Sequence, residues 1–460
     1  MNRTRTETDS MGPMEVPADA LYGAQTARAA ANFPVSGWRM PAQFIAALGM
    51  IKQAAAEVHG QAGRLEARLA EAIAAAAGEV AAGQLNEHFV LDVFQTGSGT
   101  STNMNANEVI AHRAAQLLGA AAVHPNDHVN LGQSSNDVIP SALHVSAALA
   151  IHTRLAPALA SLRDALADKA RQFDRIVKIG RTHLMDAVPI RLGQEFSGYA
   201  AQLDAALDNL HLAVDRLCEL PLGGTAVGTG LNAPEGFASA VCQRLAQRTG
   251  LEFHEASNKF AALGARDSAV FASGVLRGAA LAMGKIASDI RLLGSGPRCG
   301  LGELVLPATQ PGSSIMPGKV NPVICESVIQ VACQVVGCDA AVAAGATGGV
   351  GSILELNVAM PLIANNLLTA VRLMANVAGV FEARCIRGLE ANVERCHELV
   401  EQSLAMVTAL APRIGYDAAA RLAKQAQQTG RTIRELAIQQ QVLPPAELEA
   451  LLDPRTQTGR

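Results

Sequence analysis

The sequence predicts an all-α, mainly helical protein built around a central bundle of long helices, and three observations support this prediction. Aromatic residues are 3% of the 460 residues, and hydrophobic residues, many of them alanine, are 49%. Such a composition favours closely packed helices over β-sheets. Apolar residues recur at i, i+3, i+4 and i+7 in five segments, several longer than about 25 residues, which is typical of rods in a bundle.

We expect three domains along the chain. Residues 1–134 form an N-terminal domain of mixed helices and polar loops, with a helix at 102–118. Residues 135–388 form the central long-helix bundle. Residues 389–460 are more charged and form a small C-terminal helical domain with a helix at 397–410. The long helices are predicted at 138–172, 193–219, 265–294, 323–344 and 356–384.

Two of the helical segments, residues 327–338 and 356–371, carry no charged side chain. A helix that is apolar on every side is buried on every side. In a chain of this size such burial requires other copies, so we expect an oligomer built around these helices.

The composition argues against several other classes of protein. The net charge is −4 and no basic run is present, so we expect no nucleic-acid partner. The eight cysteines form no CxxC pair, and none stands with histidines at zinc-ligand spacing, so we expect free buried thiols and no metal. Neither a signal-peptide pattern nor an unbroken apolar run of about 18 residues is present. We therefore expect a cytoplasmic protein with no membrane partner.

Residues 312–322 read Gly-Ser-Ser-Ile-Met-Pro-Gly-Lys-Val-Asn-Pro and form the most informative run of the chain. The glycines and prolines predict a loop that leads into a helix. The loop carries two hydroxyls, Ser313 and Ser314, beside the cation Lys319 and the amide Asn321. A serine becomes a useful base where hydrogen-bond donors and a helix dipole stabilise its alkoxide, and the loop amides near Ser313 offer this. The alternative is an ordinary solvated loop.

Residues 180–189 contain Thr182 and His183. Because the next predicted helix opens a few residues later, we expect His183 at a helix entrance. An imidazole can move a proton near neutral pH, although a lone histidine is more often structural. Glu326 lies on the first turn of the helix after the 312–322 loop, where the helix dipole favours an acid.

Residues 132–137 read Gly-Gln-Ser-Ser-Asn-Asp and offer the side chains of Ser134, Ser135 and Asn136 to a carboxylate. They precede a predicted long helix, where an N-cap cluster and an anion site can coincide. A simple N-cap is the alternative.

Residues 96–100, Thr-Gly-Ser-Gly-Thr, form a second hydroxyl-rich loop, which includes Ser98 and Thr100. The Gly-Lys-Ser/Thr ending of a nucleotide-phosphate loop is absent. A small carboxylate therefore fits this loop better than a nucleotide.

These segments resemble those of the fumarase/aspartase superfamily. Gly318 and the Thr-His-Leu sequence at 182–184 fit its class II fumarases best, because aspartases carry glutamine at the position of His183. The resemblance covers almost the whole chain, from Asp-Ser-Met-Gly at residues 9–12 to Ile-Gly-Tyr-Asp at residues 414–417.

The resemblance implies a three-domain fumarase/aspartase-like fold whose bundle packs into a multi-subunit core. It implies a homotetramer with active sites shared between three subunits, and neither cofactor nor metal. The expected activity is reversible hydration of fumarate to (S)-malate, a step of the tricarboxylic acid cycle, by stepwise anti addition and elimination through an aci-carboxylate. Ser313 would be the base, and His183, oriented by Glu326, would act on the leaving hydroxyl.

The resemblance also suggests which residues bind ligands. Those implied for substrate binding are Ser98, Thr100, Ser134, Ser135, Asn136, Thr182, Ser314, Lys319 and Asn321. A second dicarboxylate site is suggested at His124, Asn126 and Asp127, although a plain surface turn explains that segment equally well.

Several alternatives stay open. An aspartate ammonia-lyase is the nearest rival, and lyases with larger leaving groups are more remote. Leu354 and Ile139 replace aromatic residues that are common in fumarases, so a methylated fumarate analogue is an alternative substrate. A non-enzymatic protein of this fold is a further alternative, but it predicts damage at Ser313, Lys319 or His183, and all three are present.

Overall fold

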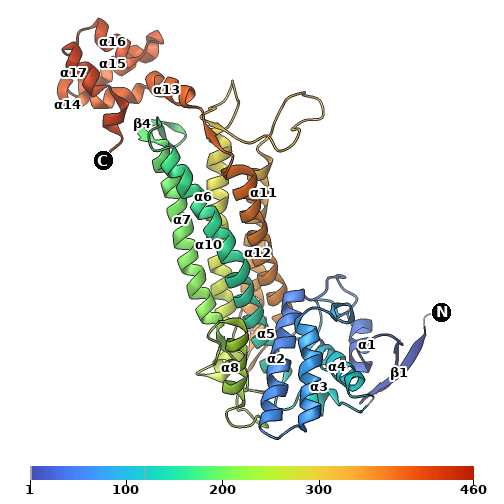
Figure 1. The fold of residues 1–460 in the computed structure, drawn as a ribbon. Helices are drawn as coiled ribbons and strands as arrows, with labels where there is room; N and C mark the ends of the chain where they lie inside the picture. The colour runs from blue at the N-terminus through green and yellow to red at the C-terminus, as the bar shows by residue number, and fades with distance from the viewer. Residues whose placement is uncertain (1–2, 120, 460) are drawn as a thin grey trace. The chain divides into compact units, whose positions relative to one another are not determined.

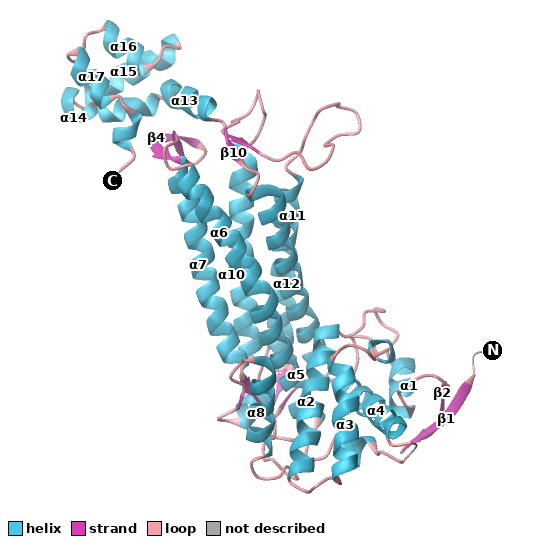
Figure 2. Cartoon of the chain, viewed as in Figure 1, coloured by secondary structure: helices cyan, strands magenta, loops and turns pink. Residues whose placement is uncertain are grey.

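The computed structural model describes residues 3–119 and 121–459. Helices dominate the chain, and the strands are short (Figure 2). Within the described part of the chain, the strands pair into five two-stranded sheets. The predicted all-α fold class is therefore confirmed.

The helices and strands follow one another along the chain with the following bounds. The α-helices are α1 (Ala24–Asn32), α2 (Ala42–Gln61), α3 (Ala67–Ala81), α4 (Thr100–Leu117), α5 (Ser135–Ala150), α6 (Ala156–Gln172), α7 (Leu192–Leu217), α8 (Phe237–Thr249), α9 (Lys259–Gly264), α10 (Asp267–Leu293), α11 (Val323–Ala346), α12 (Met360–Phe381), α13 (Val393–Gln402), α14 (Ala411–Ile414), α15 (Tyr416–Thr429), α16 (Ile433–Gln439) and α17 (Pro445–Leu451). The strands are β1 (Thr4–Asp9), β2 (Gly12–Pro17), β3 (Val177–Thr182), β4 (Met185–Arg191), β5 (Glu219–Leu220), β6 (His254–Glu255), β7 (Leu304–Val305), β8 (Ser352–Ile353), β9 (Leu356–Asn357) and β10 (Glu390–Ala391).

The chain divides into two compact units. Unit 1 comprises residues 1–157, 207–280 and 333–375, and unit 2 comprises residues 158–206, 281–332 and 376–460. The divisions fall inside the long helices α6, α7, α10, α11 and α12 (Figure 1). The three-domain division expected from the sequence stays a prediction.

The predicted long helices are confirmed. Helices α7, α10 and α11 begin and end within a few residues of the bounds that the apolar periodicity predicts. The predicted 138–172 helix is present as α5 and α6, joined without a break by a π-helical turn at Ile151–Leu155. The last of the five, predicted at 356–384, is α12, which begins only after the short β8–β9 hairpin.

Small side chains explain the close packing inside unit 1. A Cβ added to Gly49 of α2 would lie 2.5 Å from the main-chain nitrogen of Ala81 in α3. Ala54 and Ala55 of α2 and Ala77 of α3 are fully or almost fully buried. Alanine-rich helices can approach each other this closely, which agrees with the aromatic-poor composition.

Unit 2 contains a separate apolar cluster built by the C-terminal helices. Leu422 and Ala426 of α15 and Leu436 of α16 are buried in it, together with Ile179 of β3. The cluster thus fixes the position of the β3 strand within unit 2, which matters because β3 leads directly to Thr182 and His183.

The predicted single helix at 397–410 is wrong. Helix α13 ends at Gln402, and Ser403 follows with an extended backbone. The Ser403 hydroxyl accepts a hydrogen bond from the main-chain nitrogen of Ala405 and so caps a new 3-10 helix at Leu404–Ala409. A serine in this position favours an N-cap over a helix interior.

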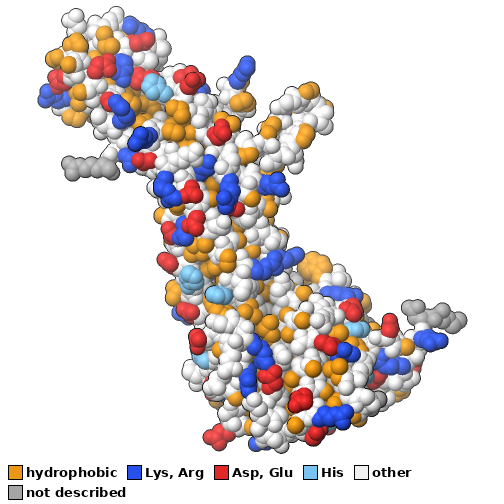
Figure 3. All heavy atoms as spheres, viewed as in Figure 1, with side chains coloured by type: hydrophobic (Ala, Val, Ile, Leu, Met, Phe, Trp, Pro, Cys, Tyr) orange, Lys and Arg blue, Asp and Glu red, His pale blue; other side chains and the backbone are white. Residues whose placement is uncertain are grey.

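Three helical stretches are long and apolar enough to cross a membrane, judged by length and composition alone. They are residues 135–172, 267–293 and 323–346, and half or less of the most apolar window of each is buried within the chain. The expectation of no membrane span rested on the lack of an unbroken apolar run. The mean hydropathy of these three helices therefore qualifies that expectation. Hydrophobic side chains are visible at the surface in Figure 3, and Leu281 of α10 and Val336 of α11 are among the exposed ones.

The cysteines are free, and six of the eight are buried. Cys299 and Cys333 are exposed. The expectation of buried thiols is therefore wrong for these two within the single chain; Cys333 lies on α11, among the partly exposed apolar helices.

Candidate functional site

The Ser313 hydroxyl is held by the main chain of its own loop. Its Oγ accepts hydrogen bonds from the main-chain N–H groups of Ile315, at 3.2 Å, and Met316, at 3.1 Å. Two donors aimed at one hydroxyl oxygen stabilise negative charge on that oxygen. This is the environment that a serine acting as a base requires.

The 312–322 loop is closed at its base by Gly312. Its N–H donates to the carbonyl of Lys319 at 2.8 Å, and its own carbonyl accepts from Nδ2 of Asn321 at 2.6 Å. A Cβ on Gly312 would lie 2.6 Å from the Lys319 carbonyl oxygen. The loop therefore needs glycine at 312. The side-chain amide of Asn321 already donates a hydrogen bond within the loop, in addition to any contact that it makes with a ligand.

Ser314 and Lys319 are exposed on the same loop. Across the described residues, neither the Ser314 hydroxyl nor the Lys319 ammonium has a hydrogen-bond or ion-pair partner. Both groups are thus free to meet an anionic ligand.

His183 lies in a tight hairpin turn rather than at a helix entrance, so that expectation is wrong. Thr182 ends β3 and pairs with Met185 at the start of β4, leaving His183 and Leu184 as the two turn residues. Their φ angles are 56° and 62°, the left-handed conformation that such a turn requires and that usually selects asparagine and glycine. The side chain of His183 is exposed.

A bidentate ion pair anchors the strand beneath this turn. Arg181 donates to both carboxylate oxygens of Glu303, at 2.8 and 3.1 Å, and Glu303 is fully buried. Lys178, also fully buried, donates to Glu195 at 3.0 Å and lies 3.6 Å from Glu303. Burial raises the pKa of Glu195, and the nearby Lys178 charge partly offsets the rise.

A cavity of about 320 Å³ adjoins the turn. His183 and Leu184 line one part of it, and Glu195, Tyr199 and Asp289 line another. All of these residues belong to unit 2. The cavity leaves room beside the imidazole for a small ligand or for water.

Glu326 is exposed on the first turn of α11. Within the part of the chain that the structure describes, no hydrogen bond or ion pair joins Glu326 to His183. The partnership expected from the family resemblance is therefore not formed inside a single chain.

In unit 1, the Ser134–Asn136 segment opens α5 with a capping box. The Ser134 hydroxyl accepts from the main-chain nitrogen of Asn136 at 3.2 Å, and Asp137 Oδ1 accepts from that of Ser134 at 2.9 Å. The Asn136 side chain donates to the carbonyl of Ala226 at 2.8 Å. The predicted N-cap is thus present, at the positive end of a helix that favours anions.

Asp137 is a positioning residue that we did not single out from the sequence. Its other oxygen accepts from the main-chain nitrogens of Gly223, at 2.9 Å, and Thr225, at 3.0 Å. The side chain is fully buried, and burial raises its pKa to about 6 in spite of these donors. The available signal was the Ser-x-x-Asp spacing from Ser134, which is the pattern of a capping box.

The Ser98 loop packs against the same helix. The hydroxyls of Ser98 and Thr100 are 2.8 Å apart, and Thr100 begins α4. Gly99 adopts a φ of 70°, and a Cβ there would lie 2.7 Å from Ile139 Cγ2. Ile139 therefore supports the loop between its two predicted ligand-binding residues.

A buried network of amides lies behind these hydroxyls. Asn103 Nδ2 donates to Ser135 Oγ at 3.0 Å and to Asn130 Oδ1 at 3.2 Å. Lys52, fully buried on α2, donates to Asn130 Oδ1 at 2.8 Å and to Gln133 Oε1 at 3.0 Å. Neither Asn103 nor Lys52 was predicted, because their contacts join distant parts of the sequence.

The predicted second site lies on a π-helical turn at Pro125–Val129. His124 Nδ1 accepts from the main-chain nitrogen of Asp127 at 3.0 Å. The side chains of Asn126 and Asp127 are exposed. The turn is confirmed, and ligand binding there stays a prediction.

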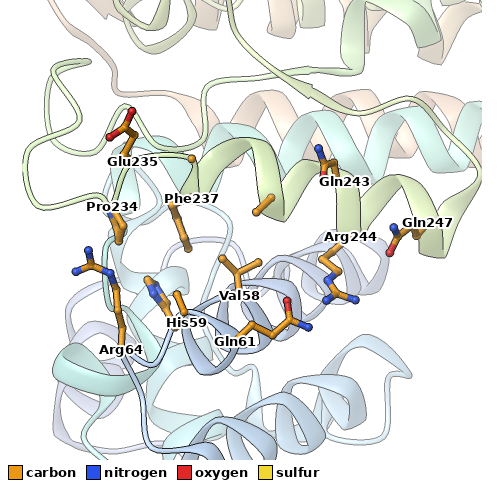
Figure 4. Close-up of a pocket in the computed structure, with 13 residues that line it drawn as sticks. Val58, His59, Gln61, Arg64, Pro234, Glu235, Phe237, Gln243, Arg244 and Gln247 are labelled. Atoms are coloured by element: carbon orange, nitrogen blue, oxygen red, sulfur yellow. The ribbon is translucent and has the colours of Figure 1, made fainter.

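A cavity of about 470 Å³ lies in unit 1 between α2 and α8, and its lining includes none of the predicted site residues. Figure 4 shows its lining, with His59 beside Phe237 and with Arg64 and Arg244 at opposite ends. His59 stacks on Phe237 with ring centres 4.7 Å apart, and its Nε2 donates to the Leu131 carbonyl at 2.8 Å. Burial lowers the pKa of His59, so we interpret it as a structural histidine.

The predicted residues thus fall into two sets according to the unit in which they lie. The set in unit 1 is Ser98, Thr100, His124, Asn126, Asp127, Ser134, Ser135 and Asn136. The set in unit 2 is Thr182, His183, Ser313, Ser314, Lys319, Asn321 and Glu326. Apart from the second-site residues His124 and Asp127, the first set offers neutral hydroxyl and amide groups, and the second set carries the candidate base Ser313, the imidazole of His183 and the free cation of Lys319.

Comparison with protein families identifies two matches. Residues 12–337 match a family described as Lyase, and residues 406–459 match one described as Fumarase C C-terminus. The two matches together take in both sets of predicted site residues and the C-terminal helices.

Individual relatives agree with these families. The fumarate hydratase class II of Chromobacterium violaceum is 52% identical over 455 residues, covering 98% of each chain. The mitochondrial fumarate hydratase of Rattus norvegicus is 50% identical over all of this chain and 91% of its own. The crystal structure of a class II fumarase from Schistosoma mansoni superposes with a TM-score of 0.95 at 43% identity, covering 98% of each chain.

Proposed function

The chain belongs to the class II fumarate hydratase family, and on that premise we propose that it hydrates fumarate reversibly to (S)-malate with Ser313 as the base. This reaction is a step of the tricarboxylic acid cycle. The observation that carries the assignment of the base is the pair of main-chain N–H groups, from Ile315 and Met316, that point at Ser313 Oγ.

In the elimination direction, deprotonated Ser313 removes a proton from C3 of malate. The electron pair of that bond moves into the adjacent carboxylate and gives an aci-carboxylate. The electron pair then returns from the carboxylate to form the C2–C3 double bond as the C2–O bond breaks, and His183 donates the proton with which the hydroxyl leaves as water. Ser313 returns its proton to solvent and His183 takes one up, which restores the site, and the hydration direction reverses each step.

The aci-carboxylate carries more negative charge than the ground state, so donors aimed at it lower the barrier most. Lys319 and Ser314 have free polar groups on an exposed loop. Thr182 lies beside His183, and Asn321 closes the loop. We propose that these four residues bind the substrate, together with the predicted substrate-binding residues of unit 1, which are Ser98, Thr100, Ser134, Ser135 and Asn136.

We propose that the active site is shared between three subunits of a homotetramer. Two observations support this. No hydrogen bond or ion pair joins Glu326 to His183 among the described residues of one chain, and α10 and α11 expose apolar side chains such as Leu281 and Val336. Burial of these faces against other copies would remove them from water. Packing against other subunits would also account for the apolar helices without a membrane. We therefore propose a cytoplasmic location.

Mixing of two inactive variants tests the shared site. His183→Asn and Ser313→Ala should each be inactive alone, and random exchange of their subunits should restore about a quarter of wild-type activity, because His183 and Ser313 of one site come from different chains. Continued inactivity after verified exchange would show that one chain supplies both residues.

The substrate is tested by absorbance of the fumarate double bond after the purified protein is added to malate, with aspartate and methylfumarate hydration run in parallel. We expect activity with malate. Activity from aspartate alone would indicate an ammonia-lyase. A preference for methylfumarate would support the alternative substrate suggested by Ile139 and Leu354. The turn at His124, Asn126 and Asp127 stays a proposed second dicarboxylate site. It is tested by calorimetry with succinate on the Ser313→Ala protein with and without His124→Ala, where loss of a second binding step would support the site and unchanged binding would reject it.

A further inference from the structure

A lysine is buried behind the Ser134–Asn136 turn without a carboxylate partner. Lys52 lies in the middle of α2, and its ammonium donates to the neutral oxygens of Asn130 and Gln133. Within the described chain, no acidic side chain forms an ion pair with it. A buried ammonium with only neutral partners is costly, which raises the question of what it does.

The network in front of Lys52 leads to Ser135. Asn130 Oδ1 accepts from Lys52 Nζ and from the amides of Asn103 and Asn107, at 2.8, 3.2 and 3.2 Å. The Asn130 amide nitrogen donates to the Gln133 carbonyl at 3.1 Å, which fixes the direction of this side chain. Since Ser135 Oγ accepts from Asn103, its own hydrogen is left to be donated to a ligand.

The charge of Lys52 responds to its surroundings near neutral pH. Burial lowers the pKa of Lys52 to about 7, and the opposite charge of Asp137 acts against this shift. Asp137 is the charged group that acts on Lys52. Three of the other charged side chains on the helices packed around α2 have partners of their own, namely Glu79 of α3 with Arg113, Arg248 of α8 with Glu57, and Glu108 of α4 with the main chain of Gly23.

We propose that Lys52 is a positioning residue that supplies positive charge to the carboxylate subsite of Ser134, Ser135 and Asn136, and that it holds its proton more firmly when a dicarboxylate is bound. The inference rests on the proposed role of these three residues in substrate binding. A charge in a dry interior acts over a longer range than one in water. The amide network both screens the charge from solvent and orients Ser135.

The consequence is a linkage between protonation and binding. The dicarboxylate favours the charged form, so binding at a pH above about 7 draws a proton from solvent. The KM for malate should then rise above this pH, about tenfold for each unit by which substrate raises the pKa of Lys52. The kcat should change less, because Lys52 does not touch the reacting atoms.

The experiment compares wild type with Lys52→Met and Lys52→Gln. Methionine has a similar length without charge, and glutamine keeps a donor for Asn130. The matched control is Lys169→Met, because Lys169 is also buried and also donates to two neutral oxygens, those of Gln172 and the Leu389 carbonyl, but lies in unit 2. The KM and kcat are measured from pH 6 to 9. Calorimetry with succinate, a dicarboxylate that cannot be hydrated, in buffers of different ionisation enthalpy gives the protons taken up on binding.

We expect wild type and Lys169→Met to take up protons near pH 8, and both Lys52 variants to show a higher KM at pH 6.5 and no such uptake. The inference is overturned if wild type takes up no proton on binding succinate. It is also overturned if a Lys52 variant that folds shows the same rise of the KM above pH 7 as wild type. Ser135→Ala separates this failure from failure of the proposed site. An unchanged KM in Ser135→Ala would reject the subsite itself. A raised KM in Ser135→Ala, together with Lys52 variants that behave like wild type, would reject only the role of Lys52.

Discussion

Arg181 binds Glu303 through two hydrogen bonds across 122 residues of sequence, directly before the turn that carries His183. The main chain of Glu303 is itself held by the carbonyl of Leu293 and by the main-chain nitrogen of Asn392. The ion pair thus links the β3 strand to a residue whose own main chain is hydrogen-bonded on both sides. Because two successive non-glycine residues with positive φ cost about 1–2 kcal/mol each, the turn needs such support.

We predict that Arg181→Lys lowers kcat about tenfold or more with a smaller effect on KM. Lysine keeps the charge but cannot form the two parallel hydrogen bonds to Glu303, so the strained turn relaxes and His183 loses its orientation. The measurement is the malate kinetics of the purified variant.

Leu184→Gly is the matched suppressor, because glycine adopts the φ of 62° without strain. The Arg181→Lys/Leu184→Gly double variant should recover part of the lost kcat. If the double variant is no faster than Arg181→Lys, the ion pair does not act through the turn.

We predict that Gly312→Ala lowers kcat by at least about tenfold, because the new methyl group would collide with the Lys319 carbonyl and break the base of the loop. Gly318→Asn is the control. It has a φ of 83° and open space around the position of a Cβ, and asparagine tolerates this conformation. Similar activity in both variants would show that the loop geometry does not limit the reaction.

We predict that His144 makes the protein less stable in mild acid. It is buried, and its Nδ1 donates to the Glu219 carbonyl at 2.8 Å. Burial and then the Arg266 charge lower its pKa from 6.5 to about 4. Between these values the unfolded chain binds more protons, so stability falls as the pH falls, by up to about 3 kcal/mol at pH 4.

Asp137 opposes this trend, because its raised pKa adds stability as the pH falls from about 6. The measurement is therefore the difference in midpoint unfolding temperature between wild type and His144→Gln at pH 7 and pH 5. The variant should lose less stability than wild type over this interval. An equal loss in both proteins would contradict the assignment.

The helices could be predicted because burial repeats along them with a regular period. Residues 265–294 were expected to be helical, and α10 runs from Asp267 to Leu293. The β3–β4 hairpin was missed because its turn residues, His183 and Leu184, are atypical of a hairpin. Local sequence preference cannot reveal a conformation that distant contacts, such as that of Arg181 with Glu303, impose.

The candidate ligand-binding residues could be predicted from short motifs, whereas the residues that support them could not. Ser313 and Ser134 stand in recognisable sequence motifs. In the structure, Ser313 accepts hydrogen bonds from main-chain N–H groups, and Ser134 caps the start of α5. Lys52 and Asn103 stand in ordinary helical sequence. Their role depends on contacts to Asn130 and Ser135 that only the folded chain brings together.

The role of Ser313 as the base is tested most directly by the initial rate of fumarate formation from (S)-malate, followed by absorbance, in wild type and in Ser313→Ala. Removal of the base should lower kcat about a thousandfold, while calorimetry should still detect binding of succinate. A variant that keeps kcat within about tenfold of wild type would show that Ser313 is not the base, and that the N–H groups of Ile315 and Met316 only shape the loop.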